Sequence, residues 1–360
     1  MPLSDPSETE RILNICAACM YCDGLCPVFP ALTGRDDDIA HLANLCHNCR
    51  ACWYACQYAP PHPFAVNAPA ALSRARRQTY ADHVWPRILR HGFVRPWLGA
   101  GGMLAATLLT FVALVVAGAP LAPGSGAFYA VIPWGWMAGL ATGALVWAAL
   151  SLVVSTLRYW RAIAAGPKPV PLGAALRRAL GDIVTLRHLD GGGPGCHETQ
   201  PFSRRRKWFH QAMAGGVMLA FAATLVAAGF EHFFGAQPPF PPASWPVLLG
   251  LFGGAGIVVG AAGLLVGEAR MDRAPADAGE SQLNVSFLIA LELVAVSGLA
   301  LLALRDTPAM GPLLLAHLSL VTGFFVGLPA SKAIHAPFRA AALLRAARNE
   351  KPKTRSPAEL

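Results

Sequence analysis

The segments CAACMYCDGLCP, residues 16–27, and CHNCRACWYAC, residues 46–56, contain eight of the nine cysteines in the chain. In each segment two residues separate the first three cysteines and three residues precede the fourth, which is the bacterial pattern for a [4Fe-4S] cluster. In two-cluster proteins the fourth cysteine of each segment binds the other cluster. The spacing therefore predicts two clusters, one on Cys16, Cys19, Cys22 and Cys56 and the other on Cys46, Cys49, Cys52 and Cys26.

A pair of structural zinc sites is the alternative, because zinc also binds four cysteines. Such sites usually join two Cys-x2-Cys knuckles across a longer gap, without a third cysteine at the same spacing, so the pattern favours iron and sulfur. Gln57 follows Cys56 where the pattern has Pro, as Pro27 follows Cys26. The flanking residues lack the β-branched alternation of strands. We therefore expect an α-helical two-cluster ferredoxin domain over residues 1–72. Its first 25 residues show no signal peptide, which favours a cytosolic location.

The rest of the chain is apolar, and the whole sequence is 54% hydrophobic and only 14% charged. Soluble domains carry about 25% charged residues. Six stretches are long enough, at about 20 residues, to cross a membrane as helices. They run from Trp97 to Gly118, Trp134 to Leu157, Trp208 to Phe230, Ser244 to Gly267, Asn284 to Leu304 and Ala309 to His335. We expect an all-α protein with a basic linker at 73–96, a six-helix domain at 97–335 that includes a cytoplasmic connection at 158–207, and a basic tail at 336–360.

The distribution of Lys and Arg supports six spans and gives their orientation. The segments before the first span, after the second, after the fourth and after Ser331 near the end of the sixth hold 9, 10, 2 and 7 of these residues, and the opposite loops hold only Arg305. The positive-inside rule places both termini and the cysteine domain in the cytoplasm. The same distribution explains the net charge of +9 without nucleic acid, because anionic lipid attracts basic residues at membrane ends. In the long connection, residues 172–189 have the spacing of an amphipathic helix, which would lie on the membrane or on the cysteine domain.

Four histidines lie within or at the ends of two spans, where ionisable residues are rare and indicate function. On antiparallel helices, His210 and His335 lie at one depth and His232 and His317 at another. In one continuous helix His317 and His335 would share a face about 27 Å apart. Facing imidazoles are what b-type haem needs in a helix bundle, so these pairs predict one or two haems. The neighbouring arginines, Arg204–Arg206 and Arg339, are expected to pair with haem propionates. We expect Cys196 and His197 to lie at the surface.

Together these residues resemble the tricarballylate-utilisation protein B family, also called citrate-utilisation protein B. The resemblance covers nearly the whole chain and includes both cysteine segments. Its other motifs are Arg187-His188-Leu189-x-Gly191-Gly192, Gly195-Cys196, Arg204-Arg205-Arg206-x-x-Phe209-His210, Glu231-His232, LALRD at 302–306, Ala316-His317-Leu318 and Lys332-x-x-His335-x-x-x-Arg339. The membrane half is also similar to the haem-b subunit of respiratory nitrate reductase. The resemblance implies a protein that reoxidises a soluble FAD-dependent tricarballylate dehydrogenase and passes electrons through the clusters and haem to membrane quinone.

The expected protein is thus an electron-transfer subunit, in the bacterial inner membrane, rather than a stand-alone catalyst. The sequence has no dinucleotide fingerprint and no nucleophile triad. A heterodisulfide-reductase-like subunit or another flavoprotein:quinone oxidoreductase with a different substrate is the alternative. A transporter with an iron–sulfur sensor would need polar residues at the membrane midplane, which are scarce here. A plain membrane scaffold is the remaining alternative.

Overall fold

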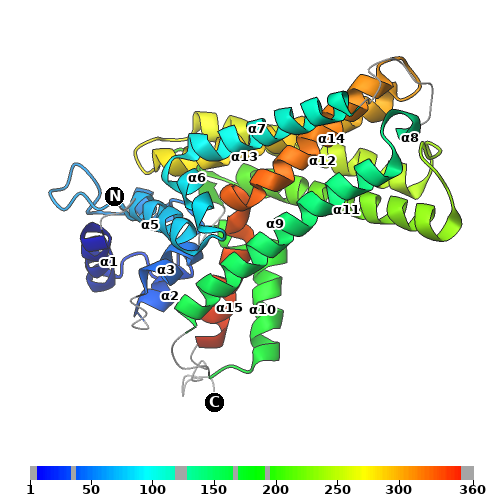
Figure 1. Cartoon of the computed structure of the whole chain (residues 1–360). Coiled ribbons are helices and arrows are strands. Elements are labelled where there is room, and N and C mark those ends of the chain that lie inside the picture. Colours follow the sequence, from blue (N-terminus) through cyan, green and yellow to red (C-terminus); the bar gives the residue numbers. More distant parts are fainter. Residues whose placement is uncertain (1–5, 34–37, 118–127, 165–168, 191–194, 350–360) are drawn as a thin grey trace.

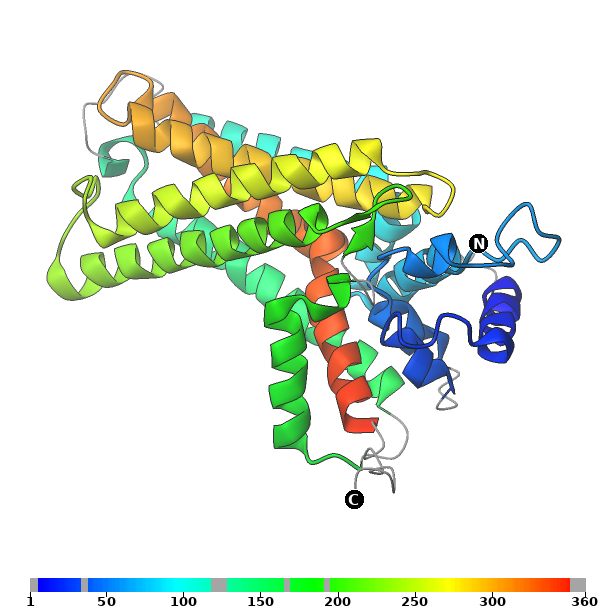
Figure 2. The same ribbon diagram turned by 180° about the vertical axis from the view of Figure 1, so that it is seen from behind.

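The computed structural model describes residues 6–33, 38–117, 128–164, 169–190 and 195–349 (Figure 1). In these ranges the regular secondary structure is helical apart from one antiparallel pair of two-residue strands, β1 (Cys196–His197) and β2 (Phe202–Ser203). This confirms the all-α prediction. Figures 1 and 2 show a bundle of long helices that meets a group of short helices near the N-terminus.

The long helices confirm the expected six spans. They are α7 (Pro96–Val116), α9 (Trp134–Ile163), α11 (Arg205–Phe234), α12 (Trp245–Arg270), α13 (Ala278–Leu304) and α14 (Met310–Gly327). Each is long and apolar enough to cross a membrane. Many of their large apolar side chains face outward, including Leu109 and Val153. Outward apolar residues are expected where lipid replaces water around the bundle. A short helix, α8 (Phe128–Val131), precedes α9.

Glycines bring α11 and α12 into close contact along their length (Figure 2). A Cβ atom on Gly216 would lie 2.6 Å from the carbonyl oxygen of Gly253. One on Gly260 would lie 2.4 Å from the backbone nitrogen of Met213. Small residues let membrane helices approach until their backbones touch, which is how such helices gain packing energy without a hydrophobic driving force.

The sixth span differs from the expected continuous helix over 309–335. Helix α14 ends at Gly327, two 3-10 turns follow at Leu328–Ala330 and Lys332–Ile334, and α15 (His335–Asn349) begins a new helix. Pro329 cannot donate a backbone hydrogen bond. Ser331 then caps the next turn by accepting from the backbone nitrogen of Ala333. Because the helix is broken, the separation of about 27 Å on one face of a single helix does not apply to His317 and His335.

The N-terminal part consists of α1 (Pro6–Cys19), α2 (Val28–Thr33), α3 (Ile39–Leu45), α4 (Ala51–Tyr54) and α5 (Ala68–His83). Its core is shared with distant segments. Leu13 and Leu42 pack in one buried cluster with Ala179 of α10 (Leu172–Thr185) and with Ala342 and Leu343 of α15. The first and last helices of the described residues therefore stabilise the same core.

Helix α10 confirms most of the helix expected at 172–189, but it ends at Thr185, where Leu186 adopts a left-handed conformation; it packs on α15 through one face. Its buried residues are Ala175 and Ala179, while Leu176 and Leu180 are exposed. Three short elements complete the described chain: 3-10 turns at Arg87–Arg90 and Arg187–Asp190, and α6 (His91–Val94).

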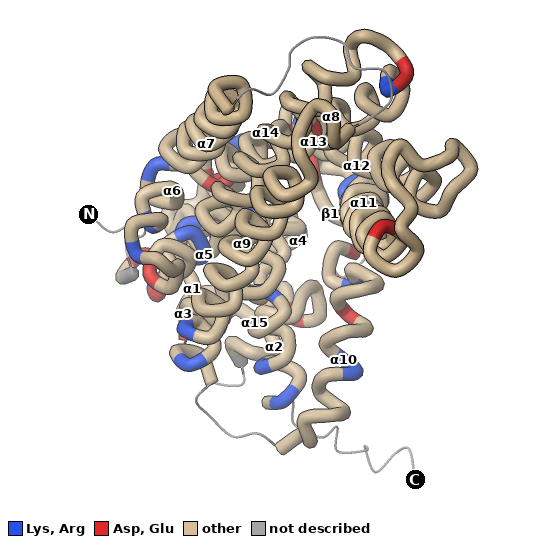
Figure 3. The backbone as a smooth tube through the Cα atoms, turned by 45° about the vertical axis from the view of Figure 1, so that its right-hand side comes forward, with Lys and Arg blue, Asp and Glu red and all other residues tan. Residues whose placement is uncertain are grey.

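Buried ion pairs join α5 to the start of α13. Arg76 donates to Glu280 at 2.7 Å, and Arg77 lies 3.1 Å from Asp277. Lys332 contacts the other oxygen of Glu280. Figure 3 shows Lys and Arg mainly on the half of the molecule that holds α5, α6, α10 and α15. The boundary expected at 72/73 lies inside α5, so one continuous helix carries the chain from the cysteine segments to these pairs.

Candidate functional site

The first cysteine set gathers where α1 ends. Burial, followed by the charges of Cys56, Cys22 and Cys19, raises the pKa of Cys16 to about 12. These four cysteines line one cavity of about 30 Å³. The Gln57 side chain donates to the Cys19 sulfur at 3.5 Å. Gln57, which stands where the cluster pattern has Pro, therefore contacts a thiol of the first cysteine set.

The second set lies beside the first. Burial, followed by the charges of Cys46 and Cys49, raises the pKa of Cys26 to about 12. Burial and then Cys26, Cys46, Cys49 and Cys22 raise the pKa of Cys52. In the described ranges no three His, Cys, Asp or Glu side chains are spaced for a single metal ion. A four-iron cluster does not need that spacing, because each of its thiolates binds a different iron atom.

The second set is covered by a segment that we expected at the surface. Cys196 is only 1% exposed and His197 is buried, which corrects that expectation. The His197 backbone nitrogen donates to the Cys49 carbonyl at 2.9 Å, and its ring lies 4.7 Å from that of Tyr54. The Cys196 thiol donates to the Leu189 carbonyl. The β1–β2 pair thus closes over the Cys49 side of the set, a long-range contact that spacing alone does not reveal.

The pair His210 and His335 is brought together, with ring centres 6.4 Å apart and ring planes at 87°. Nδ1 of His335 donates to the Lys332 carbonyl at 2.6 Å, which leaves its Nε2 free to bind a metal. Nδ1 of His210 is buried without a hydrogen-bond partner. The two rings come from different helices, α11 and α15, and α15 begins at His335.

This separation can be compared with the geometry of two imidazoles on opposite sides of one metal ion. With metal–nitrogen bonds of about 2 Å and ring centres about 1.2 Å behind the nitrogens, the centres of such a pair are about 6.4 Å apart. The observed value is the same. A buried imidazole nitrogen without a hydrogen-bond partner, such as Nδ1 of His210, also costs free energy unless a ligand binds it. The residues present therefore fit a haem iron.

Both histidines line a cavity of about 230 Å³ between the second cysteine set and the membrane helices. Apolar side chains form its membrane side, namely Met213, Leu264, Phe287 and Leu288. Charged side chains of both signs form the side toward the cysteines. The cations are Arg50, Arg76, Arg206, Lys332 and Arg339, and the carboxylates are Asp182, Glu198, Glu268, Asp277 and Glu280. The cavity is thus lined with apolar groups on one side and with charged groups of both signs on the other, which suits a ligand with an apolar ring system and a polar edge.

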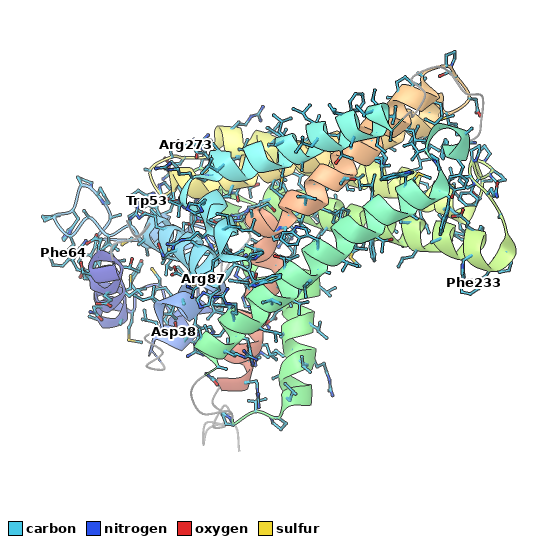
Figure 4. The ribbon with its side chains drawn as sticks, viewed as in Figure 1. Asp38, Trp53, Phe64, Arg87, Phe233 and Arg273 are labelled. Carbon is cyan, nitrogen blue, oxygen red and sulfur yellow. The ribbon has the colours of Figure 1, made fainter. Side chains whose placement is uncertain are left out.

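The other predicted histidines have separate partners. Nδ1 of His317 lies 2.9 Å from Oγ of Ser297, and the ring packs on Gly298, so His317 faces α13. His232 is exposed near the end of α11, with its ring against Phe233. Figure 4 shows Phe233 at the end of the molecule far from Trp53. A second haem on His232 and His317 stays a prediction from the sequence.

The arginines near the paired histidines bind the protein backbone. Arg206 donates to the Asn48 carbonyl at 2.7 Å, and Arg339 donates to the Cys46 carbonyl at 2.8 Å. From the sequence we expect these arginines to pair with haem propionates, whereas in the structure their guanidinium groups bind backbone carbonyls. Spacing along the chain places these arginines beside the histidines, but it does not show that the cysteine segment lies within their reach.

Comparison with known proteins adds the family. Residues 96–357 match the family Citrate utilization protein B, and residues 9–82 match the Citrate utilization protein B Fer4-like domain. The chain is similar to Citrate utilization protein B from Escherichia coli, with 40% identity over 354 residues, which cover 95% of this chain and 92% of that protein. No solved structure matches the chain. The matched regions extend over both cysteine segments and all six membrane helices, and the chain belongs to the citrate utilization protein B family.

Proposed function

We propose that the protein reoxidises a soluble FAD-dependent tricarballylate dehydrogenase and delivers its electrons to membrane quinone through two [4Fe-4S] clusters and b-type haem. It acts as the electron-transfer subunit of an oxidoreductase system. The Fer4-like match supports the iron–sulfur part. The identity of the dehydrogenase rests on the family resemblance alone. A heterodisulfide-reductase-like system or another flavoprotein:quinone oxidoreductase is the alternative, and it would use the same clusters and histidines.

The observation that carries the haem part is the 6.4 Å separation of the His210 and His335 rings above the second cysteine set. In this proposal Nε2 of His335 and a ring nitrogen of His210 would hold the iron, and the eight cysteine thiolates would hold the clusters. These groups supply one-electron carriers when bound. The chain itself fixes the His335 tautomer through the Lys332 carbonyl. It also excludes water from the membrane side of the cavity with Leu264 and Phe287.

The location proposed is the bacterial inner membrane, with both termini and the cysteine domain in the cytoplasm. Six apolar helices and the concentration of Lys and Arg on one half of the molecule support this orientation (Figure 3). A cytoplasmic cysteine domain is also where a soluble flavoprotein could reach it.

The test is the dithionite-reduced minus air-oxidised optical spectrum of the detergent-purified protein, with haem and non-haem iron measured on the same sample. We expect a b-type haem band and about eight non-haem iron atoms per chain, as two four-iron clusters require. His210→Ala should lose the haem of this site and keep the non-haem iron, because it removes one of the two residues that would hold the haem.

The control is His232→Ala, which changes an exposed histidine at the other end of α11. It should keep the haem of the His210 site. Full iron loading without any haem band would refute the role proposed for the histidine pair. It would leave a membrane-bound ferredoxin that reduces quinone directly.

A further inference from the structure

An arginine lies one helical turn from each paired histidine, on the side toward the cysteines. Arg206 precedes His210 by four residues on α11, and Arg339 follows His335 by four residues on α15. Residues four apart share one face of a helix. The two helices therefore present the same order of groups, a histidine and then a guanidinium, to the second cysteine set.

Both guanidinium groups bind the backbone of one short segment, residues 44–49, which we call the cysteine loop. Arg206 Nη1 donates to the Asn48 carbonyl at 2.7 Å. Arg339 donates twice, from Nη2 to the Cys46 carbonyl at 2.8 Å and from Nε to the Asn44 carbonyl at 3.3 Å. Bonds from a charged donor are about twice as strong as neutral ones.

A third arginine binds the same loop from another helix. Arg76 of α5 donates to the Cys46 carbonyl as well, and its other nitrogen binds Glu280 of α13. The backbone is left-handed at Asn48 in the loop and at Arg50 directly after it, with φ of 53° and 65°. Such conformations cost free energy for residues other than glycine and persist where surrounding contacts hold them.

We propose that Arg206 and Arg339 are positioning residues, which hold the cysteine loop against the two histidine-bearing helices and so make the Cys46–Cys49 cluster the one that exchanges electrons with the haem. This inference rests on the proposed function. One electron leaves the reduced cluster and is taken up by the ferric haem, so no other reactant is needed. The positive charges also favour the reduced, more negative cluster and raise its reduction potential.

The solvent exposure around the first cysteine set indicates the order in which electrons pass through the two clusters. Met20 and Tyr21, which lie between Cys19 and Cys22, are 45% and 69% exposed, whereas Arg50 and Ala51, at the same positions between Cys49 and Cys52, are buried. A soluble partner can therefore approach the first cluster, while the second faces the membrane helices. Electrons enter at the Cys16–Cys22 segment and leave through the cysteine loop.

The test separates charge from geometry with two substitutions at Arg339. Arg339→Gln removes the charge, so the midpoint potential of one cluster, titrated by EPR, should fall. Arg339→Lys keeps the charge but cannot make both hydrogen bonds, so the potential should stay near its original value. Haem reduction after pulsed reduction by a photoreduced flavin should slow by at least about tenfold in both variants, as expected when about 1.4 kcal/mol of docking energy is lost.

The control is Arg345→Gln. Arg345 also ties α15 to the N-terminal part, but it does so through the Asp38 side chain at 2.7 Å rather than through the cysteine loop. This variant should leave the cluster potential and the haem reduction rate unchanged. Unchanged potential and rate in Arg339→Gln, with full iron content, would overturn the proposal.

If Arg339→Gln loses iron, the test is instead the haem reduction rate of the charge-conserving variants Arg206→Lys and Arg339→Lys. An undiminished haem reduction rate in both would overturn the proposal, and slowed reduction with intact clusters would support it. Absence of haem from the unmodified protein would refute the proposed function instead. The cluster potential of Arg339→Gln would then still test whether the loop contact acts on the cluster.

Discussion

Replacement of Glu280 by Gln should destabilise the fold strongly, because this carboxylate faces two buried cations. Arg76 is 2.7 Å away, and the exposed fractions of the two side chains are 1% and 8%. Lys332, with 15% exposed, contacts the second oxygen. Gln has nearly the same shape, so the substitution opens no cavity and removes only the charge. Breaking a buried pair by removing one partner costs about 3–5 kcal/mol, since the remaining charge stays buried without compensation.

The assay is unfolding of the purified protein by SDS titration in mixed micelles, followed by far-ultraviolet circular dichroism. The matched control is Glu8→Gln, which breaks the exposed pair between Glu8 and Arg11. Exposed pairs contribute about 0.2–1 kcal/mol, so this variant should unfold almost like the original protein. If Glu280→Gln lost no more than about 1 kcal/mol, the argument that this carboxylate joins α5 to the membrane helices would be refuted.

Two further substitutions have matched controls in the chain. Gly216→Ala should lower the yield of folded protein and its thermal stability, because the new Cβ would meet backbone atoms of α12 at 2.6 Å, whereas Gly215→Ala has open space and should be tolerated. Cys52→Ala should lose about four of eight non-haem iron atoms on elemental analysis. Cys196→Ala should keep them all, and loss of iron in that variant would contradict the assignment of the eight cysteines.

The membrane helices could be predicted from the sequence because their signal is local. About 20 apolar residues define a span, and Lys and Arg at the ends define its orientation. The break after Gly327 was missed for the same reason. Mean hydropathy is calculated over a window of residues, so Pro329 and Ser331 hardly change its value. Even so, Pro329 follows the end of α14, and Ser331 caps the turn that leads into α15. The helix had to be divided there for His335 to begin α15 beside His210.

The contacts around the cysteines depended on tertiary structure and could not be predicted. The Cys196 region lies far from Cys49 in sequence and has no motif that points to it, although His197 bonds to the Cys49 carbonyl. The charge of Arg206 and Arg339 is evident from the sequence. Their acceptors are backbone carbonyls, which every residue has, so no pattern of side chains identifies them.

The shared core of α15 and the N-terminal helices has a consequence for biogenesis. Leu13 and Leu42 are translated before the six membrane helices, while Ala342 and Leu343, which pack against them, are translated after those helices. The cysteine segments therefore cannot complete their hydrophobic core until all six membrane helices have been made. Stable insertion of iron and sulfur should follow translation, and a truncation that removes α15 should leave the cysteines at the opposite end of the chain open to oxidation and proteolysis.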